Sequence, residues 1–198
     1  MTRFAAACVQ LNAGTEIEPN LQAAGTLIRQ ARDAGATLIA TPENTGFIAH
    51  GREAVLQRAL PEAEHPGLPF FAGLARETGA TLLIGSLSIG LPGGKAANRS
   101  YLFAPSGEIL ARYDKIHMFD VELAGGERYR ESATFAPGGQ AVAAPLPAGG
   151  VLGLTVCYDL RFAYLYRALA QAGADVLAVP AAFTRKTGQA HWHVLLRA

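Results

Sequence analysis

The chain has 198 residues, of which half are hydrophobic and 17% are charged. Its 17 basic and 16 acidic residues give a formal net charge of +1, which provides no electrostatic case for binding nucleic acid or an anionic membrane. No apolar run approaches a membrane span, and the N-terminal stretch "MTRFAAACVQLNAG" is too short for a signal-peptide core. We therefore expect one soluble globular domain over residues 1–198, located in the cytoplasm.

The first half of the chain alternates strand-like apolar runs with helix-like periodic runs, which is typical of the α/β class. In chain order, its predicted elements are a strand over 3–11, a helix over 19–34, a strand over 37–41, a helix over 68–78, and strands over 81–88 and 99–104. The first helix has the clearest pattern, because Pro19 suits a first turn and Gly35 suits a C-cap.

The second half keeps this alternation around one long aperiodic stretch. A turn at 105–107 leads into a predicted strand over 109–113, loops over 114–148, a strand over 151–156, a helix over 161–172, a strand over 176–179 and a helix from 189 onward. The segments "DAGATLIATP" and "QAGADVLAVP" match at five of ten positions. They are either two similar solutions to one junction, or a pseudo-symmetric pair whose strand ends face one cleft.

The stretch "GLTVCYDLRF" places a thiol where a buried strand gives way to a helix. Cys157 directly follows the strand, and Asp159 is a good N-cap for a helix from about Leu160. A helix N-terminus favours the thiolate, and ligands bind at the carboxyl ends of strands in open α/β sheets. Cys157 is therefore either a buried structural cysteine or a nucleophile.

Two more polar side chains follow apolar strands in the same way. Glu43 follows "LIATP", and Lys115 stands in "RYDKIH" after the strand that ends at Tyr113. Each would be an ordinary surface residue if taken alone. Together with Cys157 they form a coherent set, in which Glu43 can accept the thiol proton and Lys115 can stabilise an oxyanion.

The remaining thiol and histidines give no sign of a metal site or disulfide. Cys8 lies in the middle of the first predicted strand, where a thiol usually packs in the core. His191 and His193 are two residues apart and point to different sides of a helix, which makes a poor metal site. We expect no metal and no disulfide.

Three motifs in this order resemble those of the nitrilase superfamily of carbon–nitrogen hydrolases. "TPENTGF" resembles its glutamate motif, "YDKIHMFD" its lysine motif and "VCYDLRF" its cysteine motif. "YRESATFAPG" resembles the segment that carries a further glutamate, which corresponds to Glu131. The resemblance runs from the first strand to the last residue and is strongest to the amidase branch that includes omega-amidase and deaminated-glutathione amidase.

The resemblance implies a single carbon–nitrogen hydrolase domain with a four-layer αββα sandwich that forms a homodimer or larger homo-oligomer through helices near the active site. It implies Cys157 as nucleophile, Glu43 as general base, Lys115 as oxyanion stabiliser and Glu131 as a residue that positions Lys115 or substrate. Such an enzyme needs no cofactor. It cleaves an amide through a thioester and releases ammonia.

The substrate is expected to be a small amide that bears a carboxylate. Arg161 is a candidate to bind that carboxylate, and Phe47, Tyr158 and Phe183 are candidates to line the pocket. Two alternatives remain: a carbamoylase or nitrilase on the same site, and a truncated binding protein without turnover.

The end of the chain, "GQAHWHVLLRA", lacks the strands with which the family fold normally continues. We therefore expect a domain that is truncated at its C-terminus. Tyr164 and His193 stand where members of the family often have glutamate, and both positions concern helix packing or assembly more than chemistry.

Overall fold

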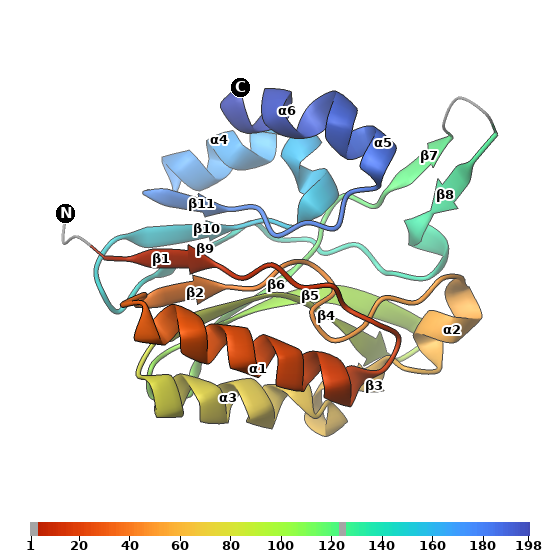
Figure 1. Ribbon diagram of the computed structural model, residues 1–198. Helices are drawn as coiled ribbons and strands as arrows, with labels where there is room; N and C mark the ends of the chain where they lie inside the picture. Colours follow the sequence, from red (N-terminus) through yellow and green to blue (C-terminus); the bar gives the residue numbers. More distant parts are fainter. Residues whose placement is uncertain (1–3, 123–125) are drawn as a thin grey trace.

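The computed structural model describes residues 4–122 and 126–198. Two β-sheets lie face to face, and helices cover the outer face of each (Figure 1). Helices α1 (Ile17–Asp33) and α3 (Gly67–Thr78) cover the larger sheet, and α4 (Ala163–Gln171), α5 (Arg185–Thr187) and α6 (His193–Arg197) lie over the smaller one. The predicted αββα sandwich is confirmed.

The larger sheet has six strands among the described residues, in the order β1-β2-β4-β5-β6, with β3 beside β4. They are β1 (Ala6–Cys8), β2 (Leu38–Ala40), β3 (Leu60–Pro61), β4 (Thr81–Leu91), β5 (Lys95–Phe103) and β6 (Ile109–Asp114). β1, β2 and β4 run parallel because α1 and α3 provide the crossovers, whereas β4, β5 and β6 are antiparallel neighbours joined by tight turns.

The smaller sheet has the order β11-β10-β9. Its strands are β9 (Val142–Pro145), β10 (Val151–Leu154) and β11 (Val176–Ala178), and α4 is the crossover between the parallel pair β10 and β11. A separate hairpin, β7 (Asp120–Glu122) with β8 (Arg128–Arg130), lies beside the two sheets. The hairpin and β9 lie in the stretch that we predicted as loops.

Two apolar clusters hold the layers together. One fills the space between α1, α3 and the larger sheet, with Ile28, Phe71 and Ile84 fully buried. The other lies between the two sheets and includes Leu102 and Leu154. Because strands of both sheets contribute to this second cluster, it fixes how the carboxyl ends of β2 and β10 face each other.

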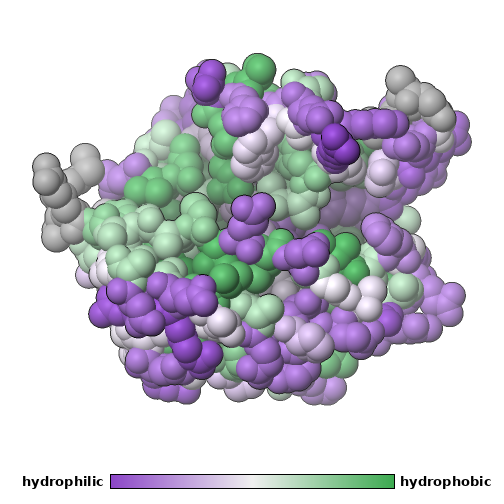
Figure 2. Space-filling view, viewed as in Figure 1, coloured by the Kyte–Doolittle hydropathy of each residue, from purple (hydrophilic) through white to green (hydrophobic). Residues whose placement is uncertain are grey.

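The front edge of both sheets carries apolar surface. Figure 2 shows hydrophilic side chains over the lower helical layer and a more hydrophobic band across the middle. Cys8 is exposed on β1, so the prediction of a core thiol was wrong. β1 is an edge strand only three residues long, and no other described strand covers its free side. Within the described residues, no helix is long and apolar enough to cross a membrane.

The remaining segments are short. α2 (Arg52–Leu56) was not predicted, and the 3-10 turns are Glu62–Glu64, Glu131–Ala133 and Cys157–Arg161. A π-helical turn, Gly188–Trp192, joins α5 to α6, so the last helical segment begins four residues earlier than predicted.

Candidate active site

Cys157 sits on a strained corner between β10 and a 3-10 turn. Its φ is +51°, a left-handed conformation that non-glycine residues seldom adopt. Its backbone N–H donates to the carbonyl oxygen of Pro180 at 2.8 Å, which holds the corner against the segment after β11. The corner therefore presents the thiol at the carboxyl end of the smaller sheet.

Asp159 does not cap a helix from Leu160 as predicted. α4 begins at Ala163, and the Asp159 carboxylate accepts instead from the N–H of Val156, at 2.8 Å. The prediction failed because a short 3-10 turn separates the strand from the helix. The dipole of α4 therefore does not start at Cys157.

Glu43 follows β2 and is 5% exposed. Its Oε1 accepts from Nζ of Lys115 at 3.1 Å and from Nδ2 of Asn98 at 2.9 Å, and its Oε2 accepts from the N–H of Ala182 at 2.9 Å. The nearby Cys157 thiol is one of the groups that lower the pKa of this carboxylate. Glu43 thus joins the larger sheet to the segment after β11, and the ends of the two repeated segments meet at this residue.

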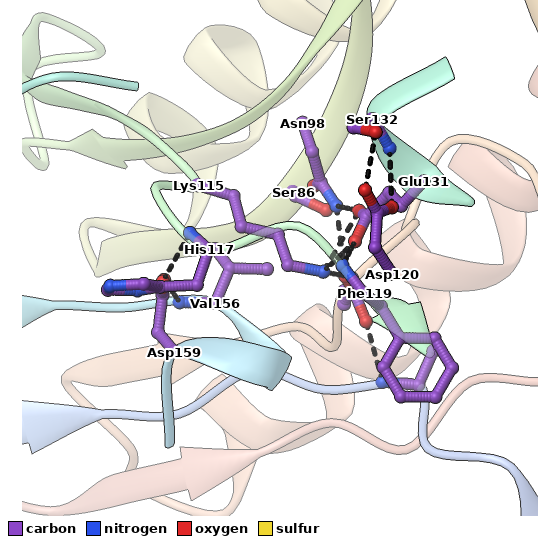
Figure 3. Close-up of polar contacts among 12 residues, drawn as sticks. Ser86, Asn98, Lys115, His117, Phe119, Asp120, Glu131, Ser132, Val156 and Asp159 are labelled. Atoms are coloured by element: carbon purple, nitrogen blue, oxygen red, sulfur yellow. Dashed lines mark hydrogen bonds and ion pairs between the residues drawn. The ribbon is translucent and has the colours of Figure 1, made fainter. Parts of the chain in front are cut away.

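Lys115 follows β6 and is 2% exposed. Its Nζ donates to both carboxylate oxygens of Glu131, at 2.9 Å each, as well as to Glu43. Glu131 is held in turn by the N–H of Phe119, which donates to Oε2 at 2.6 Å. Figure 3 shows Lys115, Glu131 and Asn98 turned toward one another from three separate elements. The structure therefore brings together all four residues predicted to carry the chemistry.

Sequence reasoning missed Asn98, which lies on β5 and is 2% exposed. Its amide donates to Glu43 and, at 3.4 Å, to Oε1 of Glu131. It bridges the two carboxylates, as Lys115 does with a charge. Asn98 stands beside Arg99 and Ser100 in its strand, so the sequence gives no signal that singles it out.

The electrostatics of the cluster keep the acid ionised and the thiol protonated. Burial opposes ionisation of Glu43, but Lys115 and hydrogen bonds from Cys157 and Asn98 leave its pKa below the usual 4.5. Burial and the Glu43 charge raise the Cys157 pKa well above the usual 9, although Lys115 acts in the opposite direction. Despite burial, the charges of Glu43 and Glu131 raise the pKa of Lys115. Cys157 is therefore a thiol beside a carboxylate, and the raised pKa is opposite to the lowering that a helix N-terminus would cause.

A cavity of about 610 Å³ opens over this cluster. Tyr158, Arg161 and Phe183 line it, and the Arg161 guanidinium lies over both rings, 5.6 Å and 5.9 Å from their centroids. Phe47 is not among the lining residues; it is 3% exposed and packs inside the protein. Its expected contact with substrate is therefore not supported.

The charged groups that line the cavity are mostly cationic. The two acids, Glu43 and Glu131, are both paired with Lys115, and the lining arginines are Arg52, Arg128, Arg130 and Arg161. Arg52 is occupied by the carbonyl oxygens of Ala133 and Gly94. Among the described residues no group of three or more His, Cys, Asp or Glu side chains could hold a metal ion.

Comparison with known proteins agrees with this geometry. The carbon–nitrogen hydrolase family model matches residues 5–198. The chain is 42% identical over 202 residues to the deaminated glutathione amidase of Synechocystis sp. (strain PCC 6803 / GT-S), covering all of this chain and 73% of that one. It is 34% identical over 199 residues to the human omega-amidase NIT2, covering all of this chain and 70% of that one.

Solved structures of related proteins superpose on this chain. The C. elegans NitFhit protein superposes with a TM-score of 0.89 at 31% identity, covering 98% of this chain and 47% of that one. An amidase from Nesterenkonia sp. superposes with a TM-score of 0.82 at 28% identity, covering 98% of this chain and 70% of that one. In one variant of that amidase, acrylamide has added to the active-site cysteine.

Fold, site and sequence together define a carbon–nitrogen hydrolase of the nitrilase superfamily. The chain belongs to the carbon–nitrogen hydrolase family, and its resemblance to the amidase branch is confirmed. The protein is accordingly an enzyme of the class that hydrolyses carbon–nitrogen bonds other than peptide bonds.

Proposed function

We propose that the protein is an amidase that hydrolyses a small, carboxylate-bearing amide through a thioester on Cys157. The observation that carries this proposal is one cavity lined by a buried thiol, Cys157, and by the carboxylate of Glu43, which is paired with the buried ammonium of Lys115. This arrangement supplies a nucleophile, a base and an oxyanion stabiliser within one cluster. The amidase relatives and the cysteine adduct in the Nesterenkonia enzyme support it.

In the first half of the reaction, Cys157 Sγ attacks the amide carbonyl carbon while its proton passes to Glu43. The carbonyl oxygen becomes an oxyanion, and the Lys115 ammonium stabilises it. Collapse of the tetrahedral intermediate breaks the carbon–nitrogen bond. The proton on Glu43 passes to the leaving nitrogen, so that ammonia departs and a thioester remains.

In the second half, Glu43 takes a proton from a water molecule as that water attacks the thioester carbonyl. Lys115 again faces the oxyanion, and the intermediate expels the Cys157 sulfur, which regains the proton from Glu43. Glu131 positions Lys115 throughout, because both of its oxygens accept from Nζ. The products are a carboxylic acid and ammonia.

The cationic wall of the cavity favours a substrate with a carboxylate distant from the amide. Arg161 is the best placed group, since it lines the cavity between Tyr158 and Phe183. An arginine flanked by aromatic rings can pair with a carboxylate through two parallel hydrogen bonds. Omega-amides of keto acids, and deaminated glutathione as in the relatives, are therefore the first substrates to test.

The experiment is ammonia release from such amides by wild-type protein, Cys157→Ala and Cys8→Ala. Cys8 is exposed on β1 and does not line the cavity, so it provides a matched control. We expect Cys157→Ala to lose at least about 10³-fold in kcat and Cys8→Ala to match wild type. Equal rates in Cys157→Ala and wild type would contradict the thioester. Added carbon dioxide release would indicate a carbamoylase, and turnover of nitriles a nitrilase.

We also propose that the enzyme is a cytoplasmic homodimer, or a larger homo-oligomer, that assembles through α4 and α6. Tyr164, Val194 and Leu196 are 65%, 66% and 45% exposed on these helices, which form the outer layer over the smaller sheet (Figure 1). Such exposed apolar side chains on one layer favour association. Both cysteines are free, which fits a reducing compartment.

A further inference from the structure

Asp159 is a buried carboxylate that the reaction scheme does not use. It is 0% exposed, and four donors converge on it. Oδ2 accepts from the Tyr113 hydroxyl at 2.7 Å and from the Val156 N–H at 2.8 Å. Oδ1 accepts from the backbone N–H and the ring Nδ1 of His117, at 3.0 Å and 2.6 Å. A carboxylate is buried at this cost only where its hydrogen bonds compensate.

Two of these partners flank Lys115 in the chain. Tyr113 precedes Lys115 by two residues and His117 follows it by two. Tyr113 is buried, as Lys115 is, and burial together with the nearby Asp159 charge raises the pKa of Tyr113, so that it remains a donor. Asp159 therefore fixes the segment on both sides of the ammonium.

The His117 ring is itself clamped. It stacks on Phe162 with centroids 3.6 Å apart and planes 9° apart, and its Nε2 lies 2.6 Å from the Tyr164 hydroxyl. Both ring nitrogens are therefore held, Nδ1 by the Asp159 carboxylate and Nε2 by the Tyr164 hydroxyl. Figure 3 shows His117 and Asp159 side by side next to Val156, apart from the Lys115–Glu131 cluster.

The third partner adjoins the thiol. Val156 immediately precedes Cys157, and its N–H donates to the Asp159 side chain while its carbonyl oxygen accepts from the Asp159 N–H at 3.1 Å. This closed pair of hydrogen bonds encloses Cys157 and its positive φ. One side chain thus connects the turn that carries the thiol with the strand end that carries the ammonium, although the two belong to different sheets.

We propose that Asp159 is a positioning residue that holds the Cys157 turn and the Lys115 segment in register, so that thiol and ammonium face the same carbonyl group. This inference rests on the proposed amidase function, and it goes beyond that function by assigning the alignment of the site to a residue that does not touch substrate. The charge on Asp159 is needed because four donors point at two oxygens.

The kinetic test is Asp159→Asn against Asp175→Asn. Asparagine offers one acceptor oxygen and places an amide N–H against two of the four donors. Asp175 is the matched control, because its carboxylate accepts from the Val151 N–H at 2.9 Å at the opposite end of β10, where it is exposed. We expect Asp159→Asn to lower kcat at least about 30-fold with KM changed less than about 3-fold, and Asp175→Asn to match wild type.

A labelling test separates alignment from simple loosening. Iodoacetamide carries an amide that can occupy the substrate position, whereas methyl methanethiosulfonate modifies any accessible thiol. Their rates at Cys157 are measured peptide by peptide, so that the exposed Cys8 does not interfere. We expect the iodoacetamide rate relative to the methanethiosulfonate rate to fall at least about 10-fold in Asp159→Asn. A general loosening of the fold would move both rates together.

Each result has one interpretation. Unchanged kcat and an unchanged labelling ratio in a folded Asp159→Asn protein would overturn the positioning role. If that variant does not fold, Tyr113→Phe removes one of the four donors, and a ratio that stays at the wild-type value there would also overturn it. Absence of turnover in wild type would count against the amidase proposal alone, because the labelling ratio does not depend on turnover.

Discussion

At the scale of single residues, the arrangement of charges sets how the thiol is activated. Lys115 lies between two carboxylates, so that the cluster of Glu43, Lys115 and Glu131 carries one net negative charge. A buried site with net negative charge disfavours ionisation of the Cys157 thiol, which explains why the pKa of Cys157 is raised. The thiol must therefore lose its proton during attack and not before it.

This predicts an unusual pH profile. The reactive state is a Cys157 thiol with a Glu43 carboxylate, and it persists from below the usual Glu pKa of 4.5 to above the usual Cys pKa of 9. We expect kcat/KM for an amide to be flat from about pH 6 to about pH 8.5, and to fall only as Glu43 is protonated in acid. Initial rates across this range test it, and a tenfold rise per pH unit between 6 and 8 would show attack by a preformed thiolate.

The sequence was sufficient to predict that Glu43, Lys115 and Cys157 lie close together, because each stands at or just past the end of a strand. It was not sufficient to find Asn98, since the predicted strand began one residue later and a polar residue there suggests solvent. The sequence identified Asp159 as a side chain that accepts from backbone N–H groups. It did not show which groups donate to it. Asp159 accepts from the preceding Val156 and from distant Tyr113 and His117, and only the packing of the two sheets decides that.

At the scale of elements, an irregularity in β4 makes room for the Glu43 turn. The register of β4 against β5 shifts between Ile84 and Leu87. Within that bulge, the Gly85 N–H donates to Thr41 Oγ1 at 3.0 Å, and Ser86 Oγ accepts from the N–H of Asn44 at 2.9 Å. A Cβ on Gly85 would lie 2.3 Å from the carbonyl oxygens of Thr41 and Pro42. The glycine thus lets the turn approach the strand.

Gly85→Ala is therefore expected to displace the turn that carries Glu43. We expect a loss of about 2 kcal/mol in the free energy of unfolding and at least about a 10-fold loss in kcat, because both neighbouring atoms are backbone and cannot rotate away. Urea melts and ammonia release measure the two effects. Gly73→Ala on α3 is the control: it meets nothing within 4 Å and should stabilise the protein by about 0.5–1 kcal/mol.

Long, regularly patterned elements could be predicted and short ones could not. α1 and α3 were placed to within two residues because their apolar stripes repeat over three turns or more. β7, β8 and β9 are three or four residues long and lie among glycines and prolines. Their hydrophobic patterns are therefore too short to predict a strand. They form because a partner strand is available: β9 pairs with β10 through Val142–Pro145.

At the scale of the whole molecule, the proposed assembly would use the outer helices. α4 and α6 present apolar side chains on the layer above the smaller sheet, next to the Cys157 turn. Tyr164 belongs both to this exposed layer and to the Asp159 network. Most of the residue is exposed, while its hydroxyl contacts His117 Nε2. Assembly through this layer would cover the ring that completes the Asp159 network.

Leu196→Glu tests this assembly. Leu196 is 45% exposed on α6, and a buried unpaired carboxylate there would oppose association. We expect wild type to sediment as a dimer or larger oligomer at micromolar concentration and Leu196→Glu to sediment as a monomer. Leu110→Glu, at a residue 37% exposed on β6, should leave the assembly intact. A wild-type monomer, or an intact assembly in Leu196→Glu, would contradict the proposed interface.

The division of the site between two sheets has a consequence for how the protein is made on the ribosome. The acid and the amine emerge first, and the thiol follows more than forty residues after Lys115. The N–H of Ala182 that fixes Glu43 emerges later still. A nascent chain thus contains Glu43 and Lys115 before it contains Cys157. It contains Cys157 before it contains the Ala182 N–H that donates to Glu43. We therefore expect acyl transfer only after the second sheet has closed on the first.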